Sequence, residues 1–226
     1  MSILPASKVR QYLRHQQELF GDTLYLPYNR SNSLKDKQGI DYLMRSLDDY
    51  DAKICHCQKC QLGKTRTNFV FGLGDSNANL MLVGEAPGEQ EDIQGEPFVG
   101  RAGKLLDKIL KAIGKQRDND VYIANVIKCR PPNNRDPLPS EVEKCEPYLR
   151  QQINLIKPKL IVALGRVAGK TLLKQDIPLK EMRCKTYDYA GTPLRVTYHP
   201  AALLRNPGLK AAAWEDFKFV RDFVNN

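Results

Sequence analysis

The sequence predicts an α/β fold built on a parallel sheet that helices cover on both sides. Two observations support this prediction. From Phe69 onward, short apolar runs rich in Val, Ile and Leu alternate with longer amphipathic segments, an order typical of strands joined by crossover helices. The runs are apolar at successive positions rather than at alternate ones, which is typical of strands buried on both faces.

Four apolar runs are expected to be the strands of this sheet, and amphipathic segments between them are expected to be helices. The strands are residues 80–83, 121–127, 160–164 and 194–197. The helices are residues 102–114, 139–156, 166–174 and 208–224. Gly114 is a suitable C-cap for the first helix, whereas Pro139 opens the second and Pro158 closes it.

A leader precedes this α/β pattern. We expect a helix over residues 6–20, a polar and turn-rich stretch over 27–38, and a second short helix around 39–50. Residues 1–50 are therefore predicted to be an N-terminal helical extension, and residues 51–226 a single domain. A chain of 226 residues is long enough to bury one α/β core.

Charge and hydropathy limit the functional class. The chain has 35 Lys and Arg against 26 Asp and Glu, for a net charge of +9. Such an excess favours encounter with polyanions such as nucleic acid, although charge alone is explained equally well by a basic, solvated surface. No apolar run reaches the ~20 residues that span a bilayer, and residues 1–20 contain no apolar signal core. We therefore expect a cytoplasmic protein without membrane contact.

Six cysteines indicate a metal site. In a reducing cytosol, clustered cysteines more often bind metal than form disulfides. Zinc ribbons usually have two tight CxxC pairs; here one pair is tight, so an iron–sulfur cube is at least as compatible with the spacing. Inert buried thiols are the alternative. We expect Cys184 to be a buried or surface thiol outside the site, and the CxxC spacing favours Cys57 over Cys55. The cysteines are Cys55, Cys57, Cys60, Cys129, Cys145 and Cys184.

Polar segments follow three of the predicted strands. GEAPGEQED comes after the first strand, Asn125 lies at the end of the second, and HPAALLRNP follows the fourth. Ligands of open parallel sheets bind beyond the carboxyl ends of the strands. These three segments are therefore expected to meet at one edge of the sheet and to form the site there.

Four motifs resemble the family 4 uracil-DNA glycosylases, over roughly residues 57–224 and in the same order. They are CQKCQLGKTRTNFVFGLG, LMLVGEAPGEQEDIQGEPFVGRAGKLLDKIL, VYIANVIKCRPPNNRDPLPSEVEKC and YHPAALLRNP. The resemblance implies a three-layer α/β/α sandwich with a central four-stranded parallel sheet. It also implies a nucleoid-associated monomer that hydrolyses uracil from DNA and leaves an abasic site. Finally, it implies a structural 4Fe–4S cluster held by Cys57, Cys60, Cys129 and Cys145.

Breaking the bond between deoxyribose and uracil leaves positive charge on the sugar and negative charge on the base. The site therefore needs a carboxylate near the sugar and donors aimed at the uracil oxygens, and the nucleotide must leave the stack. Glu85 is the first candidate carboxylate; Glu91 is a second, with a structural role as its alternative. The Asn125 amide matches the uracil edge and disfavours cytosine. A neutral His199 can donate to uracil O2.

The resemblance assigns the remaining residues. Phe98 is expected to stack on the flipped uracil, and Ala86 meets the family's usual small residue at the base-binding turn. Asn134 matches a position near the active site. In HPAALLRNP, one of two leucines is expected to fill the vacated stack while Arg205 holds a phosphate or the orphan base. The residues expected to contact DNA are Asn134, Leu203, Leu204 and Arg205.

Two alternatives are compatible with these motifs. A catalytically silent iron–sulfur module would explain the charge and the cysteines, but not why Glu85, Asn125 and His199 share one edge. A related enzyme that traps the abasic sugar covalently carries a histidine-bearing loop after the second strand. Here that loop is CRPPNNRDPLPS, without histidine, and none of the candidate site residues is a lysine that could form a Schiff base. Hydrolysis is therefore favoured.

Overall fold

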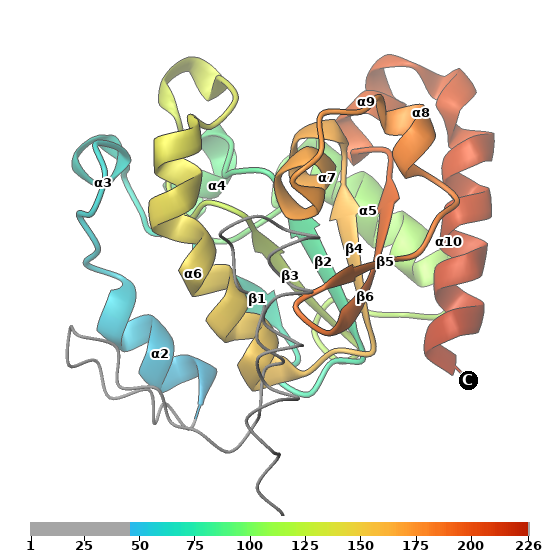
Figure 1. Cartoon of the computed structure of the whole chain (residues 1–226), viewed down its shortest axis with the longest axis horizontal. Helices are drawn as coiled ribbons and strands as arrows, with labels where there is room; N and C mark the ends of the chain where they lie inside the picture. Colours follow the sequence, from blue (N-terminus) through green and yellow to red (C-terminus); the bar gives the residue numbers. More distant parts are fainter. Residues whose placement is uncertain (1–45, 226) are drawn as a thin grey trace, which may run out of the picture. The chain divides into compact units, whose positions relative to one another are not determined.

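The structure, a computed structural model, describes residues 46–225. The predicted helix over residues 6–20 lies outside the described residues, as do most of the residues of the predicted extension. The described residues form a six-stranded mixed sheet with helices on both faces (Figure 1), and the predicted α/β class is confirmed. The strands are β1 (Leu73–Gly74), β2 (Leu80–Gly84), β3 (Val121–Asn125), β4 (Leu160–Leu164), β5 (Tyr187–Tyr189) and β6 (Thr192–Thr197).

The helices alternate with these strands. The α-helices are α2 (Leu47–Ile54), α3 (Leu62–Thr65), α4 (Glu89–Gln94), α5 (Arg101–Ala112), α6 (Pro139–Ile156), α7 (Arg166–Leu173), α8 (Leu179–Met182), α9 (Pro200–Arg205) and α10 (Lys210–Asn225). Two short 3₁₀ helices are η1 (Pro132–Asn134) and η2 (Pro207–Leu209). All four helices predicted between the strands and after them are present, within two residues at each end.

The strand order is β1-β3-β2-β4-β6-β5. Strand β2 pairs in parallel with β3 and β4, and β4 pairs in parallel with β6. The sheet is wider than predicted, because β1 and β5 add short antiparallel strands at its two edges. Neither edge strand forms an apolar run, because β1 has two residues and β5 has three, and most of these are at least partly exposed. The pattern that predicts two-sided burial therefore could not find them.

After β3 the chain continues to bond to the segment that leaves β2. The amide of Val126 donates to the carbonyl of Gly84 at 2.9 Å, and the amide of Ile127 donates to the carbonyl of Glu85 at 3.2 Å. Strand β3 itself ends at Asn125, two residues before the end of the predicted run. The two segments that carry Glu85 and Asn125 are thus held side by side by backbone bonds.

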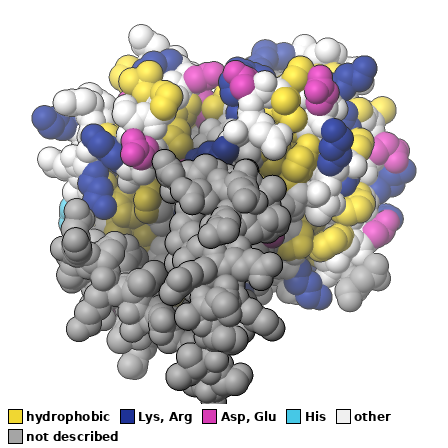
Figure 2. Space-filling model, in the orientation of Figure 1, with side chains coloured by type: hydrophobic (Ala, Val, Ile, Leu, Met, Phe, Trp, Pro, Cys, Tyr) yellow, Lys and Arg dark blue, Asp and Glu magenta, His cyan; other side chains and the backbone are white. Residues whose placement is uncertain are grey.

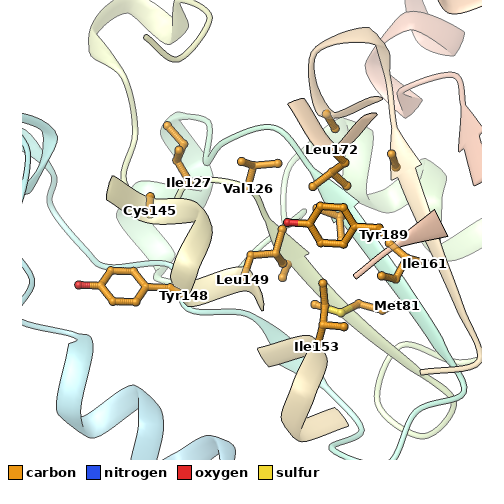
Figure 3. Close-up of a cluster of buried hydrophobic side chains, with 14 of the residues drawn as sticks. Met81, Val126, Ile127, Cys145, Tyr148, Leu149, Ile153, Ile161, Leu172 and Tyr189 are labelled. Atoms are coloured by element: carbon orange, nitrogen blue, oxygen red, sulfur yellow. The ribbon is translucent and has the colours of Figure 1, made fainter. Parts of the chain in front are cut away.

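Each face of the sheet has its own core. Leu80 and Leu82 of β2 pack with residues of α5 and α10, whereas Met81 on the same strand packs with residues of α6 and α7. Figure 3 shows Leu149 and Ile153 of α6 directed toward the sheet residues on that side. Burying one such side chain contributes about 1.5–3 kcal/mol. Packing on both faces holds the carboxyl ends of the parallel strands in a rigid frame.

Helix α2 spans the predicted boundary between residues 50 and 51. Its first turn is capped by Ser46, whose hydroxyl accepts a hydrogen bond from the Asp49 amide at 3.1 Å. The Tyr50 ring packs edge-on against Phe71 and Tyr148, at centroid distances of 5.9 and 6.3 Å. This helix is therefore part of the packed core rather than separate from it.

The surface of the described residues carries charges of both signs. On the face in Figure 2, Lys and Arg side chains are interspersed with Asp and Glu. None of the helices within residues 46–225 is both long and apolar enough to cross a membrane.

Candidate active site at the carboxyl edge of the sheet

A cavity of about 600 Å³ lies beyond the carboxyl ends of the parallel strands. The predicted convergence of the three polar segments is confirmed, because all three contribute to its wall. Of the residues predicted to contact uracil or DNA, Leu203 and Leu204 do not line it. The predicted residues that do are Glu85, Ala86, Glu91, Phe98, Asn125, Asn134, His199 and Arg205.

Glu85 follows directly after β2. Burial raises the pKa of its carboxyl to about 7; Asp136 raises it further, and Arg166 lowers it. Asp136 and Arg166 form an ion pair at 3.3 Å, and both line the cavity. The Glu85 carboxylate therefore ionises close to neutral pH, within a wall that already holds charges of both signs.

Asn125 ends β3 with its side chain buried at 2% exposure. Its Oδ1 finds no hydrogen-bond partner among the residues that the structure describes. Leaving a buried acceptor unpaired costs about 1–3 kcal/mol, so this oxygen is suited to a ligand that brings a donor. Space for the amide depends on Gly84: a Cβ there would lie 2.3 Å from Oδ1 and 2.8 Å from the Phe98 ring.

Phe98 is held in an unusual backbone conformation, with φ of 55°, which a bulky residue rarely adopts. Arg117 secures it by donating to the carbonyls of Pro97 and Phe98, each at 2.8 Å. The Phe98 ring lies 5.5 Å from the ring of His199, inclined at 31°. This strained loop presents a flat aromatic face beside the imidazole.

Glu91 supports the same loop. Its Oε1 accepts hydrogen bonds from the amides of Val99 and Gly100, each at 3.0 Å. Gly100 is the N-cap of α5, so the carboxylate satisfies amides that a helix start leaves unpaired. These bonds favour the structural alternative for Glu91 over a catalytic role.

His199 is the N-cap of α9, and its Nδ1 accepts a hydrogen bond from the amide of Ala201 at 3.1 Å. The proton of the neutral ring is therefore on Nε2. Burial lowers the pKa of the imidazole to about 4; Arg205 lowers it further, and Glu91 raises it. The ring is neutral at physiological pH and has an N–H to donate.

The rim beside α9 and η1 carries the residues predicted to contact DNA. Leu203 is buried at 1% exposure, whereas Leu204 is 37% exposed. Asn134 also adopts a positive φ, of 53°, and its Oδ1 accepts from Arg130 Nε at 2.8 Å. Of the two leucines, Leu204 is the one placed to reach a partner.

The four cysteines of the predicted ligand set approach one another beside α6. Burial raises the pKa of the Cys129 thiol most; Arg66 lowers it, and Cys60 and Cys57 raise it again. Burial also raises the pKa of Cys145 to about 12, with smaller contributions from neighbours that include Cys129 and Cys57. The Cys129 thiol thus lies within electrostatic range of the other three cysteines of the set.

Cys55 and Cys184 differ from these four. The Cys55 thiol donates to the carbonyl of Ala52 at 3.5 Å, within its own helix end. Cys184 is exposed, with its sulfur 3.9 Å from Asp216 Oδ1. Among the described residues, the sulfurs of Cys55 and Cys184 thus have hydrogen-bond partners outside the predicted ligand set.

Residues 71–218 match the family model of the uracil DNA glycosylase superfamily. The chain belongs to this superfamily. It is 49% identical over 185 residues to the type-4 uracil-DNA glycosylase of Archaeoglobus fulgidus, 46% over 190 to that of Sulfurisphaera tokodaii, and 42% over 176 to that of Thermotoga maritima. The matches cover 78, 80 and 76% of this chain and 92, 86 and 91% of the relatives. The resemblance drawn from the motifs is confirmed.

Sequence reasoning missed several residues that shape the site of this superfamily member. Arg117 forms hydrogen bonds to the carbonyls of Pro97 and Phe98, which lie 20 and 19 residues earlier in the chain. Asp136 raises the pKa of Glu85 and Arg166 lowers it, and both come from other segments of the chain. No local sequence pattern predicts such contacts between distant residues. Gly84 could have been noticed, because a glycine that ends a buried strand often marks a close approach of other groups.

Proposed function

We propose that this chain removes uracil from DNA by hydrolysing the N-glycosidic bond, leaving an abasic site in an intact strand. One observation carries the proposal: a carboxylate, a buried amide with an unpaired oxygen and a neutral imidazole line one cavity in a member of the uracil DNA glycosylase superfamily. The type-4 relatives, which match over most of their length, support the same substrate.

Asn125 reads the base. Its unpaired Oδ1 accepts from uracil N3–H while its Nδ2 donates to O4. Cytosine presents the reverse pattern, a donor where uracil has O4 and an acceptor at N3. A buried amide that faces the wrong pattern loses two hydrogen bonds, and this loss discriminates between the two pyrimidines.

His199 and Phe98 bind the departing base. The Phe98 ring stacks on one face of the flipped uracil. The Nε2–H of His199 donates to O2, where negative charge grows as the bond breaks. A neutral donor held in place by the Ala201 amide needs no reorganisation at that moment.

Glu85 acts on the sugar side. Its carboxylate stabilises the positive charge that develops on the deoxyribose and orients the attacking water. The anion is the active form, because a protonated carboxyl offers no charge to the sugar. Cleavage therefore depends on ionisation near pH 7.

The rim residues hold the DNA open. Leu204, exposed at the end of α9, enters the space that the flipped nucleotide vacates. Arg205 and Asn134 contact the backbone or the orphan base beside the cavity. The enzyme acts as a monomer on DNA in the nucleoid.

A 4Fe–4S cluster fits Cys57, Cys60, Cys129 and Cys145. No three His, Cys, Asp or Glu side chains within residues 46–225 are grouped to hold a single ion, and a cube spreads its ligands over four irons. Donors already face the sulfurs: Tyr148 Oη lies 3.2 Å from Cys57 Sγ, and the amide of Lys128 3.3 Å from Cys145 Sγ. When bound, the cluster supplies structural bonds that order the surrounding loops.

Base release from uracil-containing oligonucleotides tests the proposed activity. Duplex DNA with one uracil should yield free uracil and a strand that breaks only after alkali, whereas matched cytosine and thymine strands stay intact. His199→Ala should retain DNA affinity and lower uracil release by roughly 10²-fold. Equal release by the variant would contradict the role of His199. No release by the wild type would favour a silent DNA-binding module, and a protein–DNA adduct on a denaturing gel would favour the covalent alternative.

A further inference from the structure

The cysteine site has two parts: the loop that carries Cys57 and Cys60, and the segment after β3 that carries Cys129. Arg66 forms hydrogen bonds with both parts. It follows α3, and its Nη2 donates to the carbonyl of Cys55 at 2.7 Å. Its Nη1 donates to the carbonyl of Cys57 at 2.7 Å and lies 3.1 Å from the sulfur of Cys129, 63 residues further along the chain. One guanidinium therefore joins the CxxC loop to a sulfur from the β3–α6 loop.

A second contact crosses the site in the opposite direction. Tyr148, on α6, directs its ring away from the sheet (Figure 3), and its hydroxyl lies 3.2 Å from the sulfur of Cys57. The two parts of the cysteine site are thus linked by reciprocal bonds. The Tyr148 hydroxyl is neutral, whereas the Arg66 guanidinium also brings a positive charge to the sulfurs.

That charge matters because the site is partly buried. Four thiolates concentrate negative charge where water screens it poorly. An arginine stays protonated in such surroundings, and its planar fork can hold several acceptors at fixed angles. Bonds from an ionised donor are roughly twice as strong as neutral ones. The Phe69 ring, 5.0 Å from the guanidinium carbon, restricts the side chain further.

We propose that Arg66 is a positioning residue of the iron–sulfur site: it ties the CxxC loop to Cys129 and sets a fixed positive charge against the cluster thiolates. The inference rests on the cluster assigned to these cysteines above. It concerns the rate at which the cluster is lost and its midpoint reduction potential, not a step in uracil removal. Hydrogen bonds to cluster sulfurs and local charge are the levers by which proteins adjust these properties.

The test compares Arg66→Met, Arg66→Lys and the control Lys59→Met. Lys59 lies on the same loop, with its ammonium 4.9 Å from the Tyr148 ring centre, so the control removes a positive charge and a ring contact but leaves the bonds from Tyr148 and Arg66 to the sulfurs in place. Holoprotein is mixed with a chelator and the loss of visible absorbance is timed. Arg66→Met should lose its cluster roughly 10-fold faster than wild type. Arg66→Lys should be intermediate, and Lys59→Met close to wild type.

The midpoint reduction potential of the cluster distinguishes an electrostatic role of Arg66 from a purely structural one. Loss of a nearby positive charge disfavours the more negative, reduced cluster, so Arg66→Met should have a lower potential than wild type. Arg66→Lys keeps the charge and should remain near the wild-type value. A structural role alone would not produce this difference.

The outcomes distinguish the inference from the cofactor assignment. Wild-type protein without iron or visible absorbance would overturn both. A wild-type cluster with unchanged release and potential in Arg66→Met would overturn the role of Arg66 and leave the cofactor in place. If Arg66→Met does not fold, the decision passes to Arg66→Lys, whose release rate must exceed that of Lys59→Met for the proposal to stand.

Discussion

The ionisation of Glu85 sets the pH range of the proposed reaction. The pKa of its carboxyl, about 7, lies above the ordinary value of 4.5 because the group is buried and faces Asp136. In the proposed mechanism only the anion is active, so kcat/KM should rise as the pH passes through about 7 and then level off. His199 does not add an acid limb between pH 5 and 8, because its pKa is about 4 and the ring stays neutral there.

Single-turnover rates on uracil-containing DNA from pH 5.5 to 8.5 check this expectation. Glu85→Gln should lower kcat/KM by roughly 10²-fold and remove the rise with pH. Glu89→Gln, which alters an exposed carboxylate of the same segment, is the matched control and should keep the wild-type profile. A wild-type profile that is flat across this range would rule out Glu85 as the titrating group.

At the level of elements, the end of β2 determines whether the amide and the aromatic ring can face one cavity. Gly84→Ala would place a Cβ within 2.3 Å of Asn125 Oδ1, so the amide must move. We expect kcat/KM on uracil to fall by roughly 10²-fold and the free energy of unfolding to fall by about 1–3 kcal/mol. Gly114→Ala is the control: its φ of 73° makes alanine strained, but no atom lies within 4 Å.

Unfolding in urea and kinetics on one substrate separate the two glycine variants. Gly114→Ala should lose about 1 kcal/mol of stability and keep its activity per folded molecule. Similar kinetic losses in both variants would show that a general loss of stability, and not the crowding of Asn125, explains the effect.

Helix α9 carries two adjacent leucines with different expected roles. Leu203→Ala removes a buried side chain and should cost about 2–5 kcal/mol of stability. Leu204→Ala should leave stability within about 0.5 kcal/mol but lower kcat/KM on duplex DNA, because the vacated stack is then left empty. Single-stranded DNA has no vacated stack, so release from it should be unaffected. An equal loss on both substrates would argue against insertion by Leu204.

For the molecule as a whole, the sequence predicts most strongly those elements that are buried along their length. The strand Leu160–Leu164 and the helix Pro139–Ile156 have their predicted bounds, because an apolar run defines the first and two prolines bracket the second. Short elements were not predicted. Helices α4, α8 and α9 have six residues or fewer, too few for a helical period to be recognised.

The candidate site follows the same division. The three segments beyond β2, β3 and β6 were predicted because strand ends of a parallel sheet share an edge. Contacts that depend on tertiary structure could not be predicted, such as Arg117 beneath Phe98 or Arg66 against Cys129. Such side chains come from turns without periodicity, and only folding brings them to their partners.

The backbone bonds between the segments that leave β2 and β3 have a further consequence. Val126 and Ile127 fasten the Asn125 segment to the carbonyls of Gly84 and Glu85, so the segments that carry Glu85 and Asn125 cannot move apart without breaking main-chain bonds. The spacing of these two side-chain positions should therefore be the same before and after a base enters the cavity. The amides of Val126 and Ile127 should then exchange their hydrogens slowly in the free protein as well as in the bound one.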